Sequence, residues 1–146
     1  MKPVLLALMF LSEEHIAQMA QTFEVIYAPD APQAATAIAQ HGSRVRVVLT
    51  IGAVGLSPAQ IDALPALTLI CALGAGYENV AVAHAKARGI VVATGAGTND
   101  DCVADHTWGL LIAAQRRILP LDKATRAGIW RTALPLPPNV SHKRLG

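Results

Sequence analysis

The sequence has little charge and no dense run of Lys or Arg. Only 15% of the 146 residues are charged, and the formal net charge is +2. Binding to nucleic acid or to a membrane surface depends on a basic patch, so both functions are disfavoured. Low charge together with 53% hydrophobic residues also argues against a disordered chain. The length suffices for one domain with a substantial core.

Long apolar runs and cysteine pairs are lacking as well. No stretch is long enough to span a bilayer. The apolar run at residues 3–11 is followed at once by Ser12 and two glutamates, and no clear cleavage site follows, so we interpret it as a buried strand and not a signal peptide. Cys71 and Cys102 are isolated, and Cys71 lies in an apolar run that indicates a buried thiol. This cysteine usage is typical of a reducing compartment, and we expect a cytoplasmic protein.

What the sequence does contain is an alternation of apolar strands and helices. Ser12 is placed to cap one helix, and Ser57-Pro58 is typical of the start of another. Buried strands separated by helices predict an α/β fold, with a five-stranded parallel sheet and helices on both of its faces. The expected strands are 4–10, 23–27, 45–50, 67–72 and 90–94, and the expected helices are 13–21, 31–42, a short one from 57, and 80–88.

The pattern changes from residue 99. A long helix is expected over 100–118, then a shorter helix that ends near Gly128, then a proline-rich segment at 132–143. The last residues look like the start of a further strand. We therefore expect two parts, with residues 1–98 forming the sheet domain and residues 99–146 forming helices followed by the beginning of another domain.

Two Gly-Ala-Gly turns follow the fourth and fifth expected strands, at residues 74–76 and 95–97. The carboxyl ends of parallel strands are where such sheets bind ligands. A dinucleotide fingerprint needs a third glycine three positions after the second, but Asn79 and Asp100 stand there. Neither turn is therefore a nucleotide site.

Two interpretations of these turns remain open. They are either plain connections between a strand and a helix, or a site for a smaller anion. Because glycine lets the backbone approach a ligand closely, the amides of Ala75 and Gly76 could form a concave site for a carboxylate. Asn99, in the parallel loop, could add a side-chain amide donor.

A metal site is not predicted. Cys102, Asp105 and His106 would share one helix face. However, Asp100 and Asp101 fit the first turn of a helix, where the dipole favours carboxylates, and no second group of ligands stands elsewhere at a suitable spacing.

Several segments together resemble the D-isomer-specific 2-hydroxyacid dehydrogenases, especially the hydroxypyruvate and glyoxylate reductase branch. They occur in the order and spacing of that family and cover most of residues 45–146. The segments are "LPALTLICALGAGYENV" (64–80), "ARGIVVATGAGTND" (87–100), "CVADHTWGLLIAAQRRI" (102–118), "AGIW" (127–130) and "KRLG" (143–146).

The resemblance implies a flavodoxin-like substrate-binding domain over 1–98. Residues 99–146 would then hold crossing helices and the beginning of a nucleotide-binding domain, truncated before its glycine fingerprint. The resemblance places the substrate carboxylate on the amides of Ala75 and Gly76, next to Gly74, with Asn99 lining the pocket and Gly52 closing it. The family's catalytic Arg, Glu and His lie beyond residue 146, so no catalytic residue is assigned here.

The resemblance also implies the reaction and the partners. The expected reaction is reduction of a small 2-keto acid, such as glyoxylate or hydroxypyruvate, to the D-2-hydroxy acid. Val103 and Thr107 would face the nicotinamide of NAD or NADP, and the helix from residue 100 would form a homodimer. Ala81 departs from the family, which usually carries a helix-capping Asp there.

Two other functions stay open from the residues alone. One is a stand-alone flavodoxin-like module that binds a small carboxylate without catalysis, and the other is a dimerisation domain. In every case we expect the present chain to be inactive by itself. The choice between NAD and NADP depends on a residue past the missing fingerprint.

Overall fold

The computed structural model describes residues 2–144. The chain divides into two compact units, one ending at Thr98 and the other beginning at Asn99. The two units are treated in turn.

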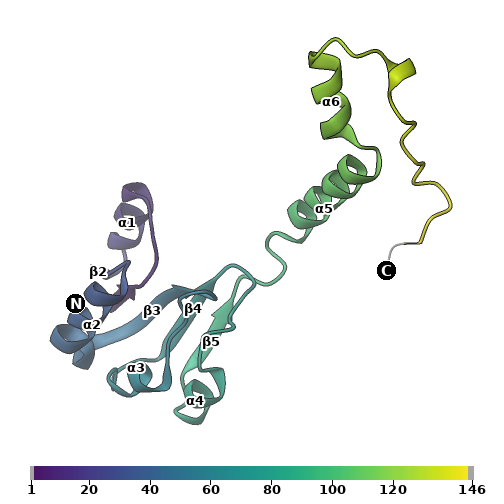
Figure 1. Ribbon diagram of the computed structural model, residues 1–146. Helices are drawn as coiled ribbons and strands as arrows, with labels where there is room; N and C mark the ends of the chain where they lie inside the picture. The colour runs from purple at the N-terminus through teal and green to yellow at the C-terminus, as the bar shows by residue number, and fades with distance from the viewer. Residues whose placement is uncertain (1, 145–146) are drawn as a thin grey trace. The chain divides into compact units, whose positions relative to one another are not determined.

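The first unit contains a five-stranded sheet in which every pair of neighbouring strands is parallel (Figure 1). The strand order is β2-β1-β3-β4-β5. This arrangement confirms the predicted α/β fold. The strands are β1 (Val4–Ala7), β2 (Glu24–Tyr27), β3 (Val45–Ile51), β4 (Leu69–Leu73) and β5 (Val91–Thr94).

The apolar side chains of β1 alternate between two cores. Val4 and Leu6 join Val48 in the larger core, whereas Leu5 and Ala7 join the smaller core on the other face. The larger core is covered by α2 (Ala31–His41), α3 (Pro58–Asp62) and α4 (Val82–Ala87), and the smaller core by α1 (Glu13–Ala20). Because both faces bury side chains, most residues of the strands are apolar.

The first strand is shorter than predicted. β1 ends at Ala7, although the apolar run extends to residue 11. Leu8 still donates its amide to the Leu49 carbonyl and is buried. Phe10, in contrast, is 81% exposed. The predicted strand was too long because Phe10 continues the apolar run although it lies outside the sheet.

Local capping fixes where the helices begin. The Ser12 side chain accepts a hydrogen bond from the His15 amide at the start of α1. Ser57 and Gln60 form a reciprocal capping box at α3, with Pro58 at its first position. At α4 the cap position is Ala81, and no side chain caps the helix. The sequence predicted the caps at Ser12 and Ser57 and the position of Pro58, and the family resemblance indicated the missing cap at Ala81. The part of Gln60 in the capping box was not predicted.

The smaller-core face is only partly covered over β4 and β5. Leu73 is 55% exposed and Val91 is 61% exposed. Cys71, on the same strand as Leu73, is half-buried and not buried as its apolar run indicated. Partial burial raises the pKa of the Cys71 thiol.

The second unit is built from two helices and a short turn of 3₁₀-helix. These elements are α5 (Asp100–Gln115), α6 (Ile118–Arg126) and η2 (Arg131–Ala133). The long helix ends three residues earlier than predicted because Arg117 takes a left-handed conformation, with φ of 54°. None of the helices described between residues 2 and 144 is long and apolar enough to cross a bilayer.

Candidate functional site

Three glycine loops meet at the carboxyl edge of the sheet. A β-carbon added to Gly52, after β3, would lie only 2.6 Å from the carbonyl carbon of Gly76, after β4. The Gly95 amide, after β5, donates to the Gly74 carbonyl at 2.7 Å. The approach of these backbones is too close for a larger side chain at Gly52. The sheet order thus brings together three loops whose contacting glycines are more than twenty positions apart in the sequence.

Polar side chains hold the loop that follows β3. Thr50, the buried polar residue of β3, donates its hydroxyl to the Gly55 carbonyl at 2.9 Å. The Asn79 side-chain amide donates to the Ala53 carbonyl at 3.0 Å, and the Asn79 backbone amide donates to the Gly52 carbonyl at 3.3 Å. Asn79 therefore ties the loop after β3 to the loop after β4. Asn79, which stands where a dinucleotide fingerprint would have its third glycine, thus has a structural role.

The turn after β4 presents two unused donors. Gly74 has a φ of +85°, which turns the chain away from the strand direction. No acceptor between residues 2 and 144 receives a hydrogen bond from the amide of Ala75 or of Gly76. Ala75 is exposed and Gly76 is half-buried. Two successive amides in an accessible turn are a chemically suitable place for a carboxylate.

Glu78 is a residue of this edge that the sequence prediction missed. Its carboxylate oxygens lie 2.8 and 2.9 Å from the position of a β-carbon on Gly76, and one of them also faces Gly52. The side chain is exposed. The sequence does show an acidic residue two positions after the Gly-Ala-Gly turn. Spacing alone, however, does not reveal that its carboxylate folds back onto the glycines.

The remaining predicted residues belong to α5 of the second unit. Asn99 occupies the cap position of α5, yet its side chain makes no capping hydrogen bond. Val103 is 54% exposed. Thr107 donates its hydroxyl to the Val103 carbonyl at 2.7 Å, so this hydroxyl keeps only its acceptor capacity for a ligand. Asp100 and Asp101 lie in the first turn, as expected from the helix dipole.

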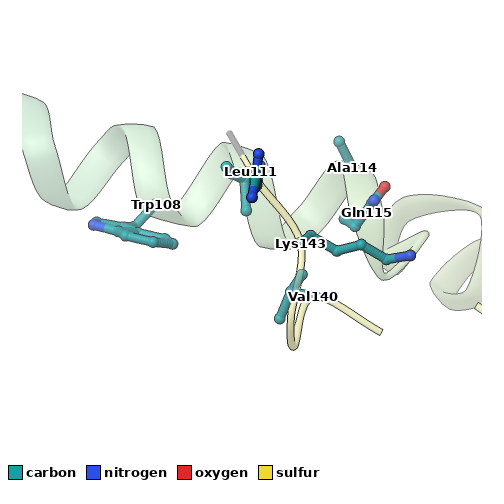
Figure 2. Close-up of a pocket in the computed structure, with 7 residues that line it drawn as sticks. Trp108, Leu111, Ala114, Gln115, Val140 and Lys143 are labelled. Atoms are coloured by element: carbon teal, nitrogen blue, oxygen red, sulfur yellow. The ribbon is translucent and has the colours of Figure 1, made fainter. Parts of the chain in front are cut away.

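The second unit also carries an apolar groove of about 330 Å³. Figure 2 shows Trp108 and Leu111 of α5 along it, with Val140 and Lys143 from the C-terminal segment. None of the predicted site residues lines this groove. Trp108 is 60% exposed.

A second cluster missed by the sequence joins α3 to α4. The Asp62 carboxylate is 2.8 Å from His84 Nε2 and 3.3 Å from Arg88 Nη1. Arg88 also donates to the Ile61 carbonyl at 2.6 Å. The hydrogen bond from His84, with the nearby Arg88 charge, holds the pKa of Asp62 below its ordinary value. The cluster fastens two short helices, and its members are too far apart in sequence to be paired by spacing.

The fold is that of a parallel α/β protein in which glycine-containing loops lie together at the carboxyl ends of the strands. The model of the catalytic domain of D-isomer specific 2-hydroxyacid dehydrogenases matches residues 5–135. The chain therefore belongs to the D-isomer specific 2-hydroxyacid dehydrogenase family. This finding confirms the resemblance drawn from the sequence segments.

Individual relatives agree with the family assignment. A glyoxylate reductase of Korarchaeum cryptofilum is 26% identical over 134 residues, which are 91% of this chain and 40% of that protein. A glyoxylate/hydroxypyruvate reductase of Arabidopsis thaliana is 32% identical over 109 residues, covering 73% of this chain and 34% of that one.

Solved structures give the same picture. A 2-hydroxyacid dehydrogenase from Ketogulonicigenium vulgare matches with a TM-score of 0.84 and 31% identity, over 95% of this chain and 44% of that one. The NADPH-dependent glyoxylate/hydroxypyruvate reductase of Sinorhizobium meliloti, solved with NADP and malonate, matches with a TM-score of 0.80 and 28% identity, over 99% and 44%. The chain spans less than half the length of each of these relatives.

Proposed function

We propose that this chain is the substrate-binding portion of an NAD(P)-dependent oxidoreductase that reduces a small 2-keto acid to the D-2-hydroxy acid. Glyoxylate and hydroxypyruvate are the proposed kind of substrate. The observation that carries the proposal is the pair of unused amides at Ala75 and Gly76, on an edge fixed by Gly52 and Gly95. The names of the relatives support the same class of substrate.

In this proposal the chain binds and orients the keto acid. The amides of Ala75 and Gly76 donate to its carboxylate, and hydrogen bonds to a charged acceptor are among the stronger ones in proteins. Thr50 and Asn79 keep the neighbouring loop in place, so that the donors need little reorganisation when the ligand arrives.

The cofactor assignment concerns the second unit. NAD or NADP, when bound, supplies the hydride. Val103 offers exposed apolar surface suited to a nicotinamide ring, whereas the Thr107 hydroxyl is already committed to the Val103 carbonyl and offers only acceptor capacity. The fit is therefore apolar contact. The Asn99 side chain makes no capping hydrogen bond, so its amide is free to donate to a ligand. No residue of the chain is assigned the role of proton donor, so we expect binding without turnover by this chain alone.

The test follows individual amides of the ¹⁵N-labelled chain during a titration with glyoxylate. We expect saturable shifts at Ala75 and Gly76. The Gly89 amide is an internal control, because it already donates to the Lys86 carbonyl in a separate turn. Its resonance should not shift during the titration. Saturable shifts confined to other regions, with Ala75 and Gly76 unchanged, would remove the proposed site. A parallel assay of glyoxylate-dependent NADPH oxidation should detect no turnover.

A dimerisation function is favoured by a separate observation. No residue of α5 is buried within the chain, and Trp108, Leu110 and Ile112 are each at least 41% exposed. We propose that α5 takes part in a homodimer of a cytoplasmic protein, since so much exposed apolar surface favours association. Light scattering after gel filtration tests this proposal. A dimer that binds no glyoxylate would leave dimerisation as the chain's function.

A further inference from the structure

The Glu78 carboxylate is placed against the same backbone that presents the two unused amides. Both of its oxygens lie within 3 Å of where a β-carbon of Gly76 would stand. One of them also faces the corresponding position of Gly52. The two glycines therefore leave the space that this carboxylate occupies, and a larger residue at either position would meet it.

No basic side chain among residues 2–144 pairs with Glu78. The ion pairs found across residues 2–144 involve Glu24, Asp62 and Asp122, and Glu78 is absent from them. Within the same residues its carboxylate accepts no hydrogen bond from a side chain. No described residue between 2 and 144 therefore neutralises its negative charge, and this charge acts on any anion that binds beside it.

We propose that Glu78 determines specificity by charge, favouring monoanionic 2-keto acids over those that carry a second negative group. This inference rests on the proposed function, because it takes the carboxylate site to be the amides of Ala75 and Gly76. The ligand's own carboxylate is held by two donors that offset the repulsion. A second charged group has no such donors among the residues identified here, so it meets the repulsion from Glu78 without compensation.

The size of the effect follows from Coulomb's law. Two unit charges about 6 Å apart in a water-like dielectric repel enough to change a dissociation constant by about threefold. Each additional negative charge on the ligand therefore weakens binding by about that factor. Because exposed charges are screened, the effect should shrink as ionic strength rises towards 1 M.

The test compares oxamate with oxalate, which have nearly the same shape but carry one and two negative charges. Calorimetry on the chain measures both dissociation constants in the wild type and in Glu78→Gln. We expect the ratio of the oxalate constant to the oxamate constant to fall by about threefold in Glu78→Gln, and the difference to fade at high salt. Glu78→Asp keeps the charge and should keep most of the wild-type ratio.

A matched control removes a different carboxylate. Glu24 begins β2 at the opposite end of the strands and pairs with Arg44 at 2.7 Å on the surface. Glu24→Gln makes the same change in net charge and should leave the ratio unaltered.

A ratio that stays constant in Glu78→Gln, or that falls equally in Glu24→Gln, would overturn the inference while leaving the carboxylate site intact. If neither ligand shifts the amides of Ala75 and Gly76, the proposed function itself fails, and the inference fails with it.

Discussion

Gly52→Ala tests the contact between the two loops most sharply. The new β-carbon would lie 2.6 Å from the Gly76 carbonyl carbon and 2.8 Å from its oxygen. Ordinary van der Waals contact begins at 3.4 Å, so the Gly76 loop has to move by about 0.8 Å. These two atoms belong to the backbone and cannot rotate aside, whereas the Glu78 carboxylate, which also meets the new β-carbon, is a side chain that can turn away. The strain of such overpacking is about 1–3 kcal/mol, and the reduced freedom of the unfolded chain returns about 0.4–1 kcal/mol.

The same movement should weaken ligand binding. Hydrogen bonds to amides hold a narrow range of distances, and a displacement of this size takes at least one donor out of range. A hydrogen bond to a charged group is worth about 1.5–3 kcal/mol, so the dissociation constant for oxamate should rise by about tenfold to a hundredfold. Calorimetry measures the binding, and urea denaturation measures the free energy of unfolding.

Gly109→Ala is the matched control for this prediction. Gly109 lies inside α5, where a β-carbon would meet nothing within 4 Å. Alanine should therefore stabilise the helix by about 0.5–1 kcal/mol and leave oxamate binding unchanged. If Gly52→Ala were as stable as the wild type and bound oxamate equally well, the loops after β3 and β4 could not lie as close together as the backbone distances indicate.

Three further changes probe other parts of the first unit. Thr50→Val leaves the Gly55 carbonyl without its hydroxyl partner, so the free energy of unfolding should fall by about 1–3 kcal/mol; an unchanged urea midpoint would contradict this. Ala81→Asp supplies the missing cap of α4 and should raise the free energy of unfolding by about 1 kcal/mol, whereas a loss would show that the cap geometry is unsuitable. Asp62 has a pKa lowered from its ordinary 3.8, so its contribution to stability is present above that pH and is lost as the pH falls through the folded-state pKa. Asp62→Asn should flatten the fall in stability between about pH 5 and pH 2, and a slope identical to that of the wild type would refute the assignment.

Much of the fold could be predicted because its signals are local. Ser12 and the pair Ser57-Pro58 mark helix starts through hydrogen bonds within a few residues. The apolar strands are recognisable because both faces of the sheet bury side chains. The strand ends were less accurate, since Leu8 is buried after β1 has ended and Phe10 continues the apolar run while exposed.

The parts that escaped prediction depend on contacts between distant segments. Asp62 meets His84 and Arg88 only after α3 and α4 have packed together. Glu78 lies near Gly52 only because β3 and β4 are neighbours in the sheet. The Gly-Ala-Gly turn itself could be recognised in the sequence. The position of the negative charge beside it could not, because the Glu78 side chain folds back onto the turn.

The most direct test of the account is a crystal structure of this chain with oxamate. We predict that the carboxylate of oxamate lies with its oxygens about 2.7–3.2 Å from the amide nitrogens of Ala75 and Gly76. Oxamate bound in the same crystal at another place, with both amides facing only water, would contradict the central claim.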